Sequence, residues 1–137
     1  MMMAIRDRNS AAQGFYNGAK VLQQLGIPTM FIDVDGNQEL IRKMPEAIST
    51  INDHLVQQYR FQGGLSKPAA PGTAPGTAQI WGKVLVFCES GNERSPAVVT
   101  AYLMAMYQMD IVTAVQYIQQ QRFCASIPLS VLSSKWN

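Results

Sequence analysis

Three short apolar runs along the chain predict β-strands, at 1–6, 30–34 and 84–87. The last run has four apolar, partly β-branched residues and follows Gly82. A run of this kind predicts a strand buried on both faces, which is typical of an α/β architecture.

Longer stretches with apolar residues at helical spacing predict helices between and after these strands. The predicted helices span 9–25, 40–59, the segment that follows Pro96, 110–122 and, briefly, 130–136. The first would be capped by Asn9 or Ser10 and end at Gly26. Pro45 is expected to shift or kink the second, because proline removes a helical hydrogen bond. Asp110 is a good N-cap for the helix over 110–122.

The segment 62–80 differs from the rest of the chain. It is rich in Gly, Pro, Ala and Thr and contains the sequence Pro-Gly-Thr-Ala twice. No core can be built from such a composition, so we predict a flexible insertion in a single domain that spans 1–137. Its function is either that of a docking or regulatory loop or none beyond a tolerated insertion, since long loops are closed at little entropic cost.

Composition limits the classes of function. The chain has 137 residues, 47% of them hydrophobic, which suits one domain with one core. A net charge of +2 is too mild to indicate a nucleic-acid partner, and no run is long enough to span a membrane. The first four residues lack a charged leader, and the two cysteines form no disulfide framework. We therefore expect the cytoplasm or the nucleus.

The segment between the third predicted strand and the next helix carries the chemistry. It begins with Cys88 and reaches Arg94 after five residues. Ser95 is a suitable N-cap and Pro96 a suitable first helical residue, so the loop opens a helix whose N-terminus favours anions. Gly91 allows the backbone to approach a ligand closely. The helix end and Arg94 should favour the Cys88 thiolate, and the guanidinium can hold two phosphate oxygens.

Less specific explanations exist for the two central residues. Cys88 could be a buried thiol in an apolar strand, because free cysteine is among the most buried residue types. Arg94 could be a solvated arginine at a helix start, although the helix dipole disfavours a cation there. Neither explanation accounts for the accompanying glycine, serine and helix start.

The segment from Cys88 to Arg94 matches the signature of the protein tyrosine phosphatases, a cysteine and an arginine separated by five residues. Ser95-Pro96 and the segment 101–104 resemble the small dual-specificity branch. The segments 3–6 and 122–124 are similar to the serine/threonine/tyrosine-interacting subgroup, whose best-known member is a pseudophosphatase. The resemblance implies an α/β fold with a central, mainly parallel sheet flanked by helices and a phosphate-binding loop between strand and helix.

The resemblance also implies a two-step reaction without a metal ion or other cofactor. Cys88 would attack phosphorus, and water would hydrolyse the cysteinyl-phosphate. Ser95 would support departure of the thiolate. The loop residues would bind the phosphate: Glu89, Ser90, Gly91, Asn92, Glu93 and Arg94.

The acid for the leaving oxygen is an aspartate after an upstream strand in this family. Asp35 is the candidate and Asp33, inside the predicted strand, the runner-up. The alternative for Asp35 is an ordinary turn, because Asp-Gly-Asn tolerates positive φ.

The sequence departs from the family pattern around the cysteine. Phe87 replaces a histidine that orders the loop, which should raise the cysteine pKa. Glu89 and Glu93 add negative charge where a phosphate dianion would bind, and either could pair with Arg94. The segment 125–128 replaces a turn that contains asparagine, and the chain begins where the family has already contributed a strand or two.

Two functions therefore stay open. The first, which the intact Cys88, Arg94 and Ser95 favour, is a protein phosphatase that acts on phosphotyrosine, with phosphoserine and phosphothreonine as further substrates. The second is a pseudophosphatase that binds phosphorylated proteins or competes for phosphatase partners. In both, the partner is a phosphorylated protein rather than nucleic acid or a membrane, and the oligomeric state is left open.

Two further residues have structural interpretations. His54, the only histidine, is predicted to be a partly exposed helix residue rather than a base. Cys124 is predicted to be a core thiol, with a reversible disulfide to Cys88 as the alternative.

Overall fold

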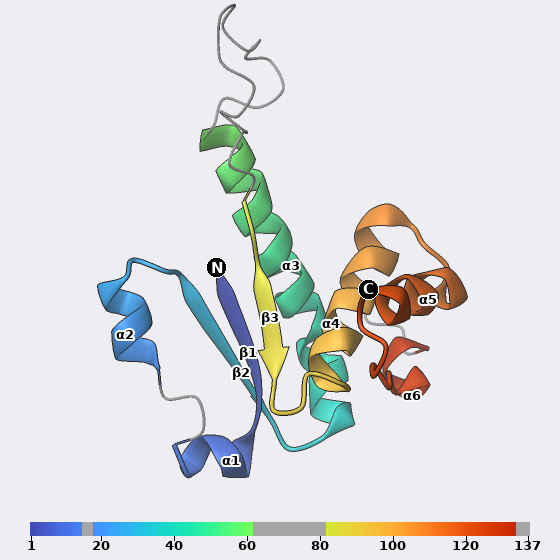
Figure 1. Cartoon of the computed structure of the whole chain (residues 1–137), viewed down its shortest axis with the longest axis horizontal. Helices are drawn as coiled ribbons and strands as arrows, with labels where there is room; N and C mark the ends of the chain where they lie inside the picture. Colours follow the sequence, from blue (N-terminus) through green and yellow to red (C-terminus); the bar gives the residue numbers. More distant parts are fainter. Residues whose placement is uncertain (15–17, 62–81, 134–137) are drawn as a thin grey trace, which may run out of the picture.

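Three parallel strands form the sheet that carries the candidate site (Figure 1). The computed structural model describes residues 1–14, 18–61 and 82–133. Strand β1 (Met2–Asp7) lies between β2 (Thr29–Val34) and β3 (Leu85–Cys88). The register aligns Ile5 with Ile32 on one side and with Cys88 on the other. These strands confirm the three predicted from the apolar runs, each displaced by one residue at most.

One face of the sheet forms the core. Met3 and Ile5 on β1 and Val34 on β2 have no exposed surface, and Cys88 belongs to the same buried cluster. Helices α3 (Asn37–Phe61) and α4 (Arg94–Tyr107) pack together on the core side. Because side chains alternate along a strand, Met3, Ile5 and Asp7 point to one face and Met2, Ala4 and Arg6 to the other.

The later helices follow the sequence pattern closely. Helix α3 continues through Pro45 without interruption. Helix α5 (Ile111–Gln121) is capped by Asp110, whose side chain accepts a hydrogen bond from the Thr113 N–H, as predicted. The short helix α6 (Leu129–Leu132) packs against α3 and α4. The prediction of a helix over 130–136 is therefore correct in kind, although residues 134–137 lie outside the described residues.

The prediction of one helix over 9–25 is wrong. The described part of this range forms two short helices instead, α1 (Arg8–Ala12) and α2 (Ala19–Gln24). Gly14 has a φ of 89°, which no right-handed helix contains, and a turn at 13–14 ends α1. The N-cap of α1 is Asp7 rather than Asn9 or Ser10.

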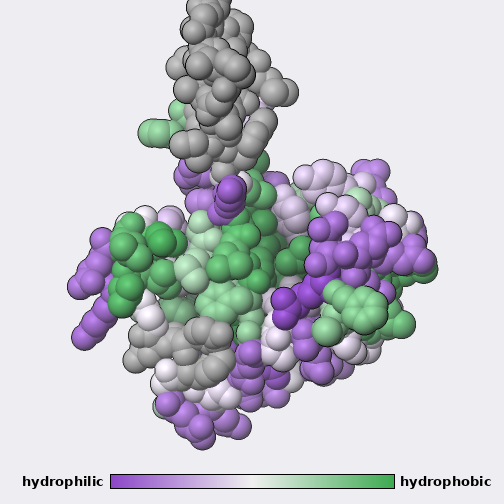
Figure 2. Space-filling view, in the orientation of Figure 1, coloured by the Kyte–Doolittle hydropathy of each residue, from purple (hydrophilic) through white to green (hydrophobic). Residues whose placement is uncertain are grey.

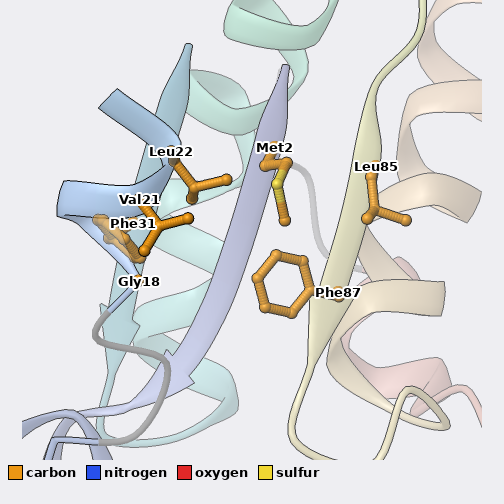
Figure 3. A pocket seen from close by; sticks show the side chains of 7 residues that line it. All are labelled: Met2, Gly18, Val21, Leu22, Phe31, Leu85 and Phe87. Atoms are coloured by element: carbon orange, nitrogen blue, oxygen red, sulfur yellow. The ribbon is translucent and has the colours of Figure 1, made fainter. Parts of the chain in front are cut away.

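The prediction that the third strand is buried on both faces is also wrong. Leu85 is 56% exposed, and it lines an open pocket on the face of the sheet to which its side chain points. On the face away from α4, an apolar pocket of about 560 Å³ lies between the sheet and α2. Figure 3 shows Met2 and Phe87 at this pocket, and Figure 2 shows the apolar surface over the same part of the sheet.

The predicted insertion 62–80 lies outside the described residues. Among the residues that are described, no helix has the length and apolar character needed to cross a membrane.

Candidate active site

Cys88 ends β3 at the carboxyl edge of the parallel sheet. Cys88 is 6% exposed and packs with the apolar core, whereas the next two residues, Glu89 and Ser90, are exposed. The loop then turns at Gly91, where φ is 70°, and α4 begins at Arg94. Strand β3 thus places the sulfur at the base of a loop that ends at a helix N-terminus.

The sulfur is surrounded by hydrogen-bond donors. The Sγ atom of Cys88 lies 3.2 Å from the Ser95 hydroxyl oxygen and accepts a hydrogen bond from the Gly91 N–H at 3.2 Å. Ser95 is not the N-cap that the sequence predicts. Glu93 has that position, without a side-chain hydrogen bond, and Ser95 is inside the first turn with its hydroxyl directed to the sulfur.

These donors determine the pKa of Cys88. Burial raises the pKa, but hydrogen bonds from the Ser95 hydroxyl and from the N–H groups of Ser95, Gly91 and Arg94 outweigh burial, so the pKa lies below its ordinary value. The ring of Phe87, the residue expected to raise this pKa, lies at the apolar pocket on the opposite face of the sheet. The geometry therefore favours the thiolate, the form of cysteine that acts as a nucleophile.

A polar pocket of about 310 Å³ opens above the sulfur. It is lined by Asp7, Cys88, Glu89, Ser90, Glu93 and Arg94. Arg94 is half-buried, and no carboxylate among the described residues lies within ion-pairing distance of it. Glu89 and Glu93 are exposed and do not close the site by pairing with Arg94. Arg94 therefore lines a pocket that also contains the nucleophile, together with three acidic residues.

The C-terminal part of the chain holds the loop from outside. The Arg122 Nη2 atom donates to the Ser90 carbonyl oxygen and to the Asn92 Oδ1 atom, each at 3.3 Å. The Ser126 N–H donates to the Asn92 carbonyl oxygen at 2.7 Å. A Cβ atom added at Gly91 would lie 2.7 Å from Arg122 Nη2. The positive φ therefore favours glycine here, and a side chain at this position would also displace the end of the Arg122 side chain.

The two aspartates predicted as acid candidates lie outside this pocket. Asp33 accepts two hydrogen bonds from Arg6, at 2.7 and 3.0 Å, on the face of the sheet opposite Cys88. The Asp35 carboxylate is 61% exposed and accepts a hydrogen bond from Arg8 at 2.6 Å. The same guanidinium also bonds to Glu39, which accepts a hydrogen bond from the Asp35 N–H. Neither aspartate lines the pocket that contains Cys88.

The remaining predicted residues have simpler positions. His54 is partly exposed on α3, as predicted, and burial together with the charge of the Met1 amino group lowers its pKa. Cys124 is exposed, so the prediction of a core thiol is wrong; it lies in the segment between α5 and α6, which leaves its side chain at the surface. Within the described residues, no group of His, Cys, Asp and Glu side chains is suited to hold a metal ion.

Asp7 and Arg122 contact the site but are not predicted from the sequence as site residues. Asp7 ends β1, whose carboxyl end lies beside that of β3 because the two strands are parallel. The rule that parallel strands place their functional residues at one sheet edge could have identified it. Arg122 follows α5, and no local signal connects it to a loop thirty residues away in the chain.

Residues 76–132 match the family described as dual specificity phosphatase, catalytic domain. Together with the fold and the cysteine loop, this match makes the chain similar to the dual-specificity branch of the protein tyrosine phosphatase superfamily. Within that branch it resembles the serine/threonine/tyrosine-interacting subgroup.

Individual relatives are similar to this chain over short segments. A segment of 45 residues is 49% identical to rat dual specificity protein phosphatase 5 and covers 33% of this chain and 12% of that protein. A segment of 49 residues is 45% identical to the human serine/threonine/tyrosine-interacting protein and covers 36% of this chain and 22% of that protein. The matched segments thus span less than a quarter of these relatives.

A solved structure extends the similarity to the whole fold. The crystal structure of the human tyrosine phosphatase-like serine/threonine/tyrosine-interacting protein superposes with a TM-score of 0.64 at 26% sequence identity. The superposition covers 96% of this chain and 70% of that chain.

Proposed function

We propose that this chain is a cysteine-dependent protein phosphatase that hydrolyses phosphotyrosine, with phosphoserine and phosphothreonine as further substrates. The observation that supports this proposal most directly is the environment of the Cys88 sulfur. A hydroxyl group and backbone N–H groups surround it and lower its pKa, and they do so at the base of a pocket that also contains Arg94. A nucleophile and a fixed cation in one pocket are what phosphoryl transfer to cysteine requires.

In the first step, the Cys88 thiolate attacks phosphorus and the leaving oxygen departs with a proton from an acid. Arg94 and the loop from Glu89 to Glu93 bind the phosphate oxygens as charge develops on them. In the second step, water attacks the cysteinyl-phosphate, and the Ser95 hydroxyl stabilises the departing thiolate. Asp35 is the acid predicted from the sequence, with Asp33 as runner-up, and its use would require the carboxylate to leave Arg8.

The second candidate function is that of a phosphate-binding protein without turnover. The carboxyl groups of Asp7, Glu89 and Glu93 favour it, because like charge opposes both the thiolate and a phosphate dianion. The similarity to the serine/threonine/tyrosine-interacting subgroup favours it as well. In this case the loop would recognise a phosphorylated protein or compete with an active phosphatase for its partners.

The decisive experiment is rapid-mixing hydrolysis of an aryl phosphate by the wild type, from acidic to weakly basic pH. Cys88→Ser is the test variant and Cys124→Ser the matched control, because Cys124 is exposed and outside the pocket. The phosphatase predicts a burst and turnover that Cys88→Ser abolishes and Cys124→Ser retains. Phosphate or vanadate binding without a burst would establish the second function, and turnover that survives Cys88→Ser would exclude a covalent mechanism.

The wider setting is proposed on the same basis. The chain 1–137 acts as a single phosphatase-like domain, and its partner is a phosphorylated protein. A reactive thiolate persists best where thiols are kept reduced, so we assign the protein to the cytoplasm or the nucleus.

A further inference from the structure

We propose that Asp7, rather than Asp35 or Asp33, is the carboxyl group that protonates the leaving oxygen; this rests on the proposed phosphatase function. Asp7 is the last residue of β1 and lines the pocket together with Cys88 and Arg94. Ile5 is the register partner of Cys88, and Asp7 is two residues beyond Ile5. Side chains two apart on a strand share a face, so Asp7 points to the same side of the sheet as the sulfur.

The carboxyl group of Asp7 is held by few hydrogen bonds and is therefore available for this role. Its Oδ1 atom accepts only the long, 3.4 Å hydrogen bond from the Asn9 N–H, and its Oδ2 atom has no hydrogen-bond partner within the described residues. The residue is half-buried. By contrast, Asp33 and Asp35 are each bound by an arginine outside the pocket.

Asp7 also belongs to an element outside the loop that carries Cys88. In an in-line displacement the leaving oxygen is on the side of phosphorus opposite the attacking sulfur. Its proton donor must therefore come from outside the loop that carries Cys88. Of the three carboxyl groups in the pocket, Glu89 and Glu93 belong to that loop, whereas Asp7 belongs to a different strand. The Asp7 N–H donates to Glu89 at 3.3 Å, which fixes this strand end against the loop.

The proposed proton transfers balance over the cycle. The Cys88 thiolate forms the S–P bond while the P–O bond to the substrate breaks, and the electron pair of that bond takes the proton of the Asp7 carboxyl group. The resulting Asp7 carboxylate then removes a proton from the water that attacks phosphorus. The S–P bond breaks, the thiolate returns, inorganic phosphate leaves, and Asp7 is again protonated.

The test compares aryl phosphates with good and poor leaving groups, nitrophenyl phosphate and phenyl phosphate. Asp7→Asn is the main variant, because asparagine caps a helix as well as aspartate and preserves α1. Asp35→Asn tests the competing acid, and Asp53→Asn, at an exposed position on α3, is the matched control. General acid catalysis contributes about 100-fold or more, so Asp7→Asn should lower kcat/KM for phenyl phosphate, which reports the first step alone, by about that factor.

The dependence on leaving group separates chemistry from structure. Asp7→Asn should change kcat/KM for nitrophenyl phosphate by less than about tenfold, because a good leaving group needs little protonation and kcat/KM does not include the second step. Asp35→Asn and Asp53→Asn should behave as the wild type with both substrates. An equal loss of kcat/KM on both substrates, no loss on either, or a selective loss in Asp35→Asn would overturn the assignment of Asp7. A wild type without Cys88-dependent turnover would overturn the phosphatase function itself, and the assignment with it.

Discussion

The Cys88 sulfur and the Ser95 hydroxyl oxygen lie 3.2 Å apart, although seven positions separate the two residues in the chain. This contact joins the end of β3 to the first turn of α4 across the loop. The hydroxyl is one of the main groups that lower the pKa of the thiol, against the effect of burial. Removal of this single oxygen should therefore alter the chemistry of Cys88 more than the fold.

Replacing Ser95 with alanine should raise the pKa of Cys88. A hydrogen bond to a charged group contributes about 1.5–3 kcal/mol, which corresponds to about one pH unit or more. The rate of iodoacetamide alkylation, measured as a function of pH, reports the thiolate fraction and should shift to higher pH by that amount. Ser49→Ala, at an exposed position on α3, is the control and should leave the profile unchanged. An unshifted profile in Ser95→Ala would show that the hydroxyl does not support the thiolate.

The lowered pKa of Cys88 should also make the stability of the protein depend on pH. Between the folded and the unfolded pKa of this thiol, the unfolded state binds more protons, so the free energy of unfolding rises with pH in that interval. The contribution is complete above the unfolded pKa and is lost as pH falls through the folded pKa. It amounts to about 1.4 kcal/mol for each pH unit that separates the two values.

Urea unfolding of the wild type and of Cys88→Ser at several pH values measures this contribution. The unfolding free energy of the wild type minus that of Cys88→Ser should grow as pH rises through the interval, because serine does not titrate there. Cys124→Ser should follow the wild type. A difference that stays constant or shrinks with rising pH would contradict a lowered pKa.

The sequence predicts the parts of this site that are local in the chain. The strand, the loop that begins at Cys88 and the following helix depend on neighbouring residues, and the pattern predicts all three in this order, although the helix begins at Arg94 rather than at Pro96. The hydrogen bond of the Ser95 side chain does not follow from neighbouring residues. The hydroxyl bonds to the Cys88 sulfur rather than capping the helix, because the loop folds back on Cys88. Periodicity alone could not distinguish these two hydrogen bonds.

Parts of the site that depend on strand pairing are not predicted from the sequence. Asp7 lines one pocket with Cys88 because β1 lies beside β3, and Asp33 is on the other face of the sheet, where its register partner is Arg6. The order of the strands decides both facts, and it is not encoded in any single segment. Similarly, the apolar run at 84–87 predicts a strand without revealing that Leu85 would be exposed.

Gly91 should not tolerate a side chain. Its φ of 70° belongs to the left-handed region, where alanine costs about 1–2 kcal/mol, and the new Cβ atom would meet Arg122. Gly26→Ala is a matched control, since φ is 68° there and nothing lies within 4 Å of a Cβ atom. Both variants should lose stability in thermal unfolding, but only Gly91→Ala should also weaken vanadate binding. Unchanged vanadate affinity in Gly91→Ala would show that the loop absorbs the side chain.

The contact between Gly91 and Arg122 predicts an energetic coupling between these positions. Arg122→Ala removes the hydrogen bonds to Ser90 and Asn92 and should cost about 1 kcal/mol. It also removes the group that an alanine at position 91 would meet, so the double variant should be more stable than the sum of the single effects predicts, by about 0.5–1 kcal/mol. The same cycle with Gly26→Ala should be additive, because Gly26 has no such neighbour. If the Gly91 cycle were additive too, strain in the backbone alone would explain the glycine, and Arg122 would not limit what the loop can accommodate.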